Sequence, residues 1–101
     1  MNEADDKWWD AMVIDASDDV ALALRDLAAG ESVTVRKDGM VTRFAVIDAI
    51  PFGHKFAVRD LVRGTRIHKY GECIGAATAD IDAGSHVHVH NMASLRARQP
   101  S

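Results

Sequence analysis

The sequence is poor in the features that mark several protein classes. Cys73 is the one cysteine among 101 residues, so no disulfide can form within the chain. There is no long apolar run and no charged-then-apolar start, which argues against a membrane span and a signal peptide. The net charge is −3 and the basic residues are scattered, so neither nucleic acid nor anionic lipid is an expected partner. These absences favour a reducing, cytoplasmic setting.

The length of the chain is that of one small domain. Hydrophobic residues make up 48% of it, which is enough to close a single core. We expect residues 1–11 to form a polar, mobile leader and residues 93–101 a fraying tail, with the domain at 12–92 between them. Within the leader, Trp8-Trp9 predicts that an indole covers either the domain's own core or a partner.

Helical periodicity is also scarce, since no segment keeps an amphipathic helical pattern beyond about two turns. The segments 32–36 and 41–47 are instead rich in β-branched residues and flank Asp38-Gly39, which is typical of a hairpin turn. Ile50-Pro51-Phe52-Gly53-His54 predicts a loop that leads into a further extended segment. We therefore predict a mainly β domain.

A near-repeat with the pattern Ala-x-x-Asp-(Leu/Ile)-x-x-Gly-x-x-(Val/Ile) occurs three times, at 23–33, 57–67 and 77–87. The Asp can accept backbone N–H groups at the start of a short helical turn, and the Gly can take the positive φ needed to leave it. The irregular spacing of the copies argues against a solenoid. Each copy therefore predicts an extended segment, a short helical turn and a second extended segment within a compact domain.

Histidines alternate with valines near the end of the chain, in His86-Val87-His88-Val89-His90-Asn91. On a strand, the period of two places the three imidazoles on one face and the valines on the other. Neighbouring imidazoles can ligate one metal ion or transfer a proton, whereas the alternative is a solvated polar face on an edge strand. Spacing does not decide between these readings.

Two lysines stand beside other polar groups. His54-Lys55 follows the Pro/Gly loop, where binding groups are frequent, and Lys69-Tyr70 precedes Gly71. Either lysine can hold a substrate carboxylate or serve as an ordinary surface residue. Cys73 is more typical of a small buried apolar residue than of a nucleophile.

Five strings stand out along the chain: Asp19-Val20-Ala21-Leu22-Ala23-Leu24, Gly53-His54-Lys55-Phe56-Ala57, Lys69-Tyr70-Gly71, Ile74-Gly75 and His86-Val87-His88-Val89-His90-Asn91. Together and in this order they resemble the amino-terminal SAF domain of altronate and galactarate dehydratases. The resemblance runs from about Met12 to Met92 and extends to the small subunit of sulfolactate sulfo-lyase.

The resemblance implies a β-clip fold and an enzyme that eliminates water from an acidic sugar, an aldonate or aldarate, beside its carboxylate. It also implies a divalent metal, iron or manganese. Relatives carry a much longer second region, fused or as a partner chain, so this chain is expected to be a small subunit that is inactive alone. The oligomeric state, a homo-oligomer included, is left open.

Carried over onto matching positions, the resemblance implies roles for seven residues. The expected catalytic residues are His88, His90, Lys55 and His54; the expected substrate-binding residues are Lys69, Tyr70 and Asn91; and the expected metal ligands are His88 and His90. One departure lies at 14–19, where Ile14-Asp15-Ala16-Ser17-Asp18-Asp19 replaces a His and an amide of the family pattern by carboxylates. Two other functions remain open: the small subunit of a sulfolactate sulfo-lyase, or a non-catalytic module that binds sugar acids or assembles subunits. A small metal-binding protein in its own right is a weaker hypothesis.

Overall fold

The computed structural model describes residues 9–94, and these form nine short strands and no helix. The mainly β fold is thereby confirmed, whereas the predicted short helical turns are non-helical turns. Within the described residues, no helix is long and apolar enough to cross a membrane. The strands are β1 (Ala11–Val13), β2 (Val20–Ala23), β3 (Ser32–Lys37), β4 (Met40–Ala45), β5 (Lys55–Ala57), β6 (Arg66–Lys69), β7 (Glu72–Ala77), β8 (His86–Val87) and β9 (Met92–Ser94).

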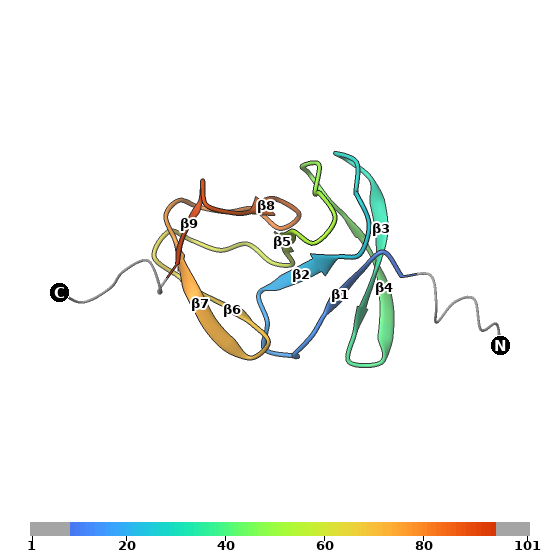
Figure 1. Cartoon of the computed structure of the whole chain (residues 1–101), viewed down its shortest axis with the longest axis horizontal. Coiled ribbons are helices and arrows are strands. Elements are labelled where there is room, and N and C mark those ends of the chain that lie inside the picture. The colour runs from blue at the N-terminus through green and yellow to red at the C-terminus, as the bar shows by residue number, and fades with distance from the viewer. Residues whose placement is uncertain (1–8, 95–101) are drawn as a thin grey trace.

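The strands form a six-stranded sheet in the order β4-β3-β1-β2-β5-β8 and a three-stranded sheet in the order β6-β7-β9. All pairs are antiparallel except β1 with β3. Two hairpins, β3–β4 and β6–β7, lie toward opposite ends of the folded part of the chain, with β1, β2, β5 and β8 between them (Figure 1).

Two buried clusters make up the core, and β5 contributes to both. Phe56 packs with Ile50 and Val33 in the first cluster, and Ala57 packs with Ile67 and Val87 in the second; all are fully buried. Because its neighbouring residues serve different clusters, β5 is held from both sides. The segment that leads into it, which carries His54, is therefore attached to a strand that packs against both clusters.

The near-repeat has four copies in the structure, and they pair two by two. Leu27 exchanges backbone hydrogen bonds with Ile50, and Leu61 exchanges them with Ile81, at N···O distances of 2.7–2.9 Å. The copy around Ile50 escapes the sequence pattern because Ala49 stands where the others have Asp. In every copy a β-turn follows, with Gly at positive φ in its third position. We call 24–30 with 47–53 the first turn pair and 58–64 with 78–84 the second turn pair.

The aspartates of the repeat accept hydrogen bonds from the paired turn. Asp26 Oδ1 accepts the N–H of Phe52 at 2.7 Å, Asp60 Oδ1 accepts that of Ala83 at 2.8 Å, and Asp80 Oδ1 accepts that of Arg63 at 2.8 Å. The prediction that each Asp accepts N–H groups of its own helical turn is therefore wrong, because the N–H donors lie 17 to 26 residues away in the paired turn. Each carboxylate joins two turns.

The ends of the chain lie partly outside the described residues, which exclude 1–8, with Trp8, and 95–101. Within the expected leader, the Arg36 guanidinium lies over the Trp9 ring, 4.5 Å from the ring centroid, and Ala11 is fully buried in β1. Of the expected tail, Ala93 and Ser94 lie in β9.

Candidate functional site

Three imidazoles converge where β5 and β8 pair. Lys55 lies opposite Val87 and Phe56 opposite His86, so His54, just before β5, is brought beside β8. His54 Nδ1 is 2.9 Å from His86 Nε2, a hydrogen bond in which one ring donates and the other accepts. The His88 ring stacks on both, with centroid distances of 4.7 Å to His54 and 5.3 Å to His86. We call His54, His86 and His88 the histidine cluster.

The predicted His-Val alternation holds for two residues and then fails. β8 ends at Val87, which is fully buried, and the chain turns immediately afterwards. Val89 is 81% exposed and not packed on the opposite face as Val87 is. The His90 ring remains near His86, at a centroid distance of 5.6 Å, but it lies outside the group of converging ligand atoms.

Asn91 closes the turn that ends β8. Its side-chain Oδ1 accepts the N–H of His88 at 2.9 Å, and its Nδ2 donates to the carbonyl of His86 at 2.8 Å. The residue is 9% exposed, so these bonds are shielded from water. Asn91 therefore fixes the backbone of two cluster histidines, and its expected role in substrate binding stays a prediction.

The surroundings of His86 and His88 favour the neutral form of both imidazoles. Burial lowers the pKa of His86, and the positive charge that His54, His88 and His90 would carry lowers it further, against the opposing effect of Asp48. Burial likewise lowers the pKa of His88, with His54 and the Lys55 ammonium adding to the shift. Neutral imidazole is the form that ligates a metal or accepts a proton, so both functions are compatible with neutral pH.

The donor set of the cluster fits a divalent transition metal. One nitrogen from each of His54, His86 and His88 lies within 4.8 Å of the other two. Imidazole suits iron and zinc, whereas manganese prefers oxygen ligands, so of the two metals implied by the resemblance the cluster fits iron better. Of the two metal ligands expected from the resemblance, His88 belongs to this group and His90 does not.

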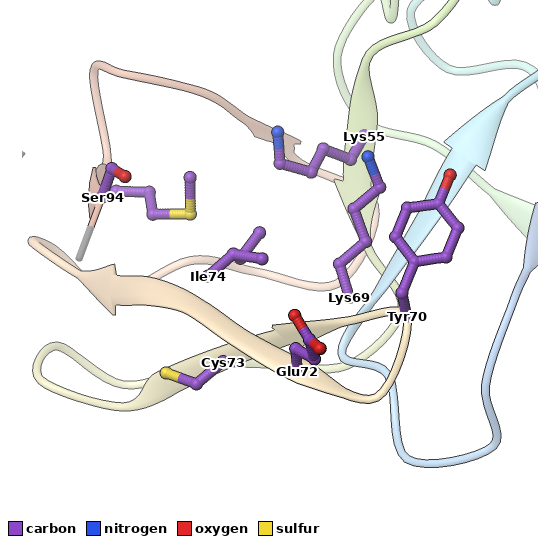
Figure 2. A pocket seen from close by; sticks show the side chains of 8 residues that line it. Lys55, Lys69, Tyr70, Glu72, Cys73, Ile74 and Ser94 are labelled. Carbon is purple, nitrogen blue, oxygen red and sulfur yellow. The ribbon is translucent and has the colours of Figure 1, made fainter. Parts of the chain in front are cut away.

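A pocket of about 390 Å³ opens beside Lys55. Lys55 from β5 and Lys69 from the end of β6 point their ammonium groups to the same side of it, and the Tyr70 hydroxyl points the same way (Figure 2). Burial lowers the pKa of Lys55, and the nearby charge of Lys69 lowers it further. Cys73 also borders the pocket, but Figure 2 shows its sulfur directed away from the lysines. Two cationic side chains thus border the same pocket.

Asp18 and Asp19 hold the strand end that carries Lys69. Asp18 accepts the N–H groups of Tyr70 and Gly71 at 2.9 and 2.8 Å, and Asp19 accepts the N–H of His68 at 2.8 Å. Asp19 is fully buried and also bonds the His68 ring. Arg59 pairs with its other oxygen. Both carboxylates therefore hold backbone, and nothing in the local sequence indicates their link to a segment some 50 residues away.

Comparison with known proteins identifies the family. Residues 9–95 match the family model described as the altronate/galactarate dehydratase SAF domain. The chain belongs to this family. The expected resemblance is thereby confirmed.

Relatives of this SAF domain are lyases of two kinds. It is 47% identical over 78 residues to altronate dehydratase of Escherichia coli (strain K12), covering 77% of this chain and 15% of that enzyme. Altronate dehydratase of Bacillus subtilis (strain 168) is 42% identical over the same shares. The (2R)-sulfolactate sulfo-lyase subunit alpha of Chromohalobacter salexigens is 40% identical over 90 residues, covering 86% of this chain and 96% of the subunit. The SAF domain thus matches a small part of the first two enzymes and nearly the whole of the third protein.

Proposed function

We propose that this SAF domain is the small subunit of a lyase that removes water from an aldonate or aldarate, together with a separate large subunit. The relatives support the reaction class, since two are named altronate dehydratases. The alpha subunit of sulfolactate sulfo-lyase supports a two-chain arrangement, because it is matched over nearly its full length.

The observation that carries the proposal is the adjacency of two lysines and neutral imidazoles. After burial and the His54 ring, the Lys55 charge also lowers the pKa of His88, so Lys55 of the pocket acts on a residue of the histidine cluster. Lys55 and Lys69 bind the substrate carboxylate, as charge-assisted pairs do. Their charges also stabilise the enediolate that forms when the α-proton leaves. Substrate binding and proton removal thus share one surface.

Proton transfer falls to the imidazoles. His90, or His88 where it holds no metal, is the candidate base that takes the proton α to the carboxylate. Hydroxide then departs from the next carbon as water, protonated by an acid of the assembled enzyme. A metal held by the histidine cluster would polarise substrate oxygens as a Lewis acid. The contribution of this chain is then to orient the carboxylate and to hold the abstracted proton.

The second candidate function is desulfonation of sulfolactate. Coverage of 96% of a sulfo-lyase subunit alpha favours it. Two ammonium groups in one pocket also match a substrate with a carboxylate and a sulfonate. A non-catalytic binding module is the remaining alternative, and it requires that the histidines have no effect on turnover.

The test is reconstitution. The SAF domain is co-purified with the large-chain product of the neighbouring gene, and elimination from altronate, galactarate and sulfolactate is measured. We expect turnover of a sugar acid by the complex and none by either chain alone. The double variant His88→Ala, His90→Ala should lose activity, while His68→Gln, in a histidine outside the cluster, should retain it. Unaltered turnover in the double variant would refute the catalytic assignment, and turnover of sulfolactate alone would select the second candidate.

A further inference from the structure

We propose that the SAF domain by itself binds one divalent transition metal ion through His54, His86 and His88, with His90 outside the ligand set. The inference rests on the geometry of the cluster and is independent of which reaction the assembled enzyme performs. It differs from the pair expected from resemblance, His88 with His90, in two of its three ligands.

The distances require a small rearrangement. Metal–nitrogen bonds of about 2.1 Å place ligand nitrogens roughly 3 to 3.5 Å apart. His54 Nδ1 and His86 Nε2 already lie 2.9 Å apart. All three ligand atoms lie within 4.8 Å of one another, so rotation of the His88 ring out of its stacked position brings its nitrogen into range.

The backbone that carries the ligands is fixed. The N–H of His54 donates to Pro51 in the β-turn of the first turn pair, and its carbonyl accepts the N–H of Ala23, both at 2.9 Å. His86 pairs with Phe56 across β5 and β8, and its N–H donates to Asp48 at 2.9 Å. The two bonds of Asn91 fix His88 relative to His86. Ligands on such pre-formed supports lose little entropy on binding.

The chemistry of the site sets its selectivity. All three ligands are imidazole nitrogens, so zinc, cobalt, nickel and iron(II) are favoured over magnesium and calcium, which prefer oxygen. Three ligands leave coordination positions open, as in catalytic metal sites. Lys55 lies close enough to act on His88 electrostatically, so an anionic oxygen is the natural ligand for an open position.

Binding has a spectroscopic consequence for the two bonded rings. One proton lies between His54 Nδ1 and His86 Nε2, and a metal needs the lone pair of both atoms. That proton must move to the other nitrogen of its ring when the ion enters. Metal binding therefore changes the tautomer of one ring, which ¹⁵N chemical shifts of the imidazoles report.

The test uses the full chain, purified without a histidine tag and stripped with chelator. Cobalt(II) chloride is titrated at pH 7.5 and followed by visible absorption and calorimetry, and zinc chloride competes in a second titration. We expect one equivalent of cobalt, displaced by zinc. In the diamagnetic zinc-loaded protein, the imidazole ¹⁵N shift changes should be confined to the three cluster histidines. His54→Ala, His86→Ala and His88→Ala should each weaken binding at least ten-fold, whereas His90→Ala and His68→Ala should change it less than two-fold.

Two results would overturn the proposal: absence of binding below about 1 mM cobalt, or a loss in His90→Ala as large as in His54→Ala. Circular dichroism verifies that each variant folds, and a variant that does not fold is replaced by the Gln substitution at the same position. The titration involves neither substrate nor large subunit. Its failure would therefore leave the proposed elimination standing, and failure of the elimination would leave the metal site standing.

Discussion

The two hairpins of the SAF domain have turns of the same conformation, but the turns differ in their residues and in what they contact. β3 and β4 meet in Lys37-Asp38-Gly39-Met40, and β6 and β7 meet in Lys69-Tyr70-Gly71-Glu72. Both turns have positive φ at their two central residues, 52° and 82° in the first and 58° and 75° in the second. Such two-residue turns match the twist of paired strands. The two turns differ in their first central residue, which is Asp38 in one and Tyr70 in the other.

Asp38 tolerates the left-handed conformation, whereas Tyr70 does not favour it. The second turn is formed nevertheless because Asp18 accepts the N–H groups of both central residues. The first hairpin has exposed residues at its tip, whereas the tip of the second borders the pocket that Lys55 and Lys69 line. A costly residue supported by a distant carboxylate is typical of a functional position.

The largest expected effect separates the two lysines that precede these turns. On the proposed function, Lys69→Met should lower kcat/KM of the reconstituted complex by about 10²-fold or more, because the proposed charge-assisted bond to the substrate carboxylate would be lost. Lys37→Met, the matched change at the exposed tip of the other hairpin, should leave kcat/KM within about two-fold, as is usual away from a site. Steady-state kinetics on both variants checks this. Equal losses in the two would remove the distinction between the hairpins.

The second effect is on stability and compares two aspartates. Asp18→Asn replaces one buried acceptor by a donor that faces backbone N–H groups, so the free energy of unfolding should fall by about 1–3 kcal/mol. Asp38→Asn at the exposed turn keeps a residue suited to positive φ and should cost less than about 0.5 kcal/mol. Urea unfolding followed by fluorescence measures both. A small loss in Asp18→Asn would show that the second turn needs no support.

The third effect exchanges stability for function within one turn. Tyr70→Asn should raise the free energy of unfolding by about 0.5–1 kcal/mol, since Asn adopts positive φ more readily. The same variant removes the hydroxyl from the pocket and should weaken substrate binding. Asp38→Tyr is the reverse exchange and should destabilise by a similar amount. A Tyr70→Asn protein that is less stable than the parent would mean that the ring's contact with Lys69 outweighs the strain.

The contrast between the hairpins also marks what the sequence could predict. Asp38-Gly39 is a local signal, and the first hairpin was predicted from it. The second turn depends on Asp18, which is 52 residues from Tyr70, and no local pattern reports that bond. A turn set by its own residues can therefore be predicted from the sequence, whereas a turn held by hydrogen bonds to a distant residue cannot.

The candidate site divides in the same way. Resemblance indicated His54 and Lys55, but their convergence with β8 depends on strand pairing that periodicity does not reveal. The alternating histidines were readable as a strand, yet the strand ends at Val87 because Asn91 binds back to the turn. The resemblance implied roles for His88 and His90 and none for His86, yet the His86 ring lies next to those of His54, His88 and His90.

The smallest expected effect concerns the turn pairs that lead into the hairpins. The second turn pair has a carboxylate in both turns, whereas the first has Asp26 in one and Ala49 in the other. By the regularity of the other three copies, a carboxylate introduced by Ala49→Asp would accept the N–H of Ala29. A net gain of about 0.5 kcal/mol is expected, because the equivalent bonds are exposed, and it should be visible as a rise of a few degrees in Tm. Ala49→Asn is the control for charge and should give a similar rise. A fall in Tm for both variants would show that the first turn pair does not accommodate a bond from residue 49 to Ala29. The two turn pairs would then share their backbone geometry but not their side-chain bonds.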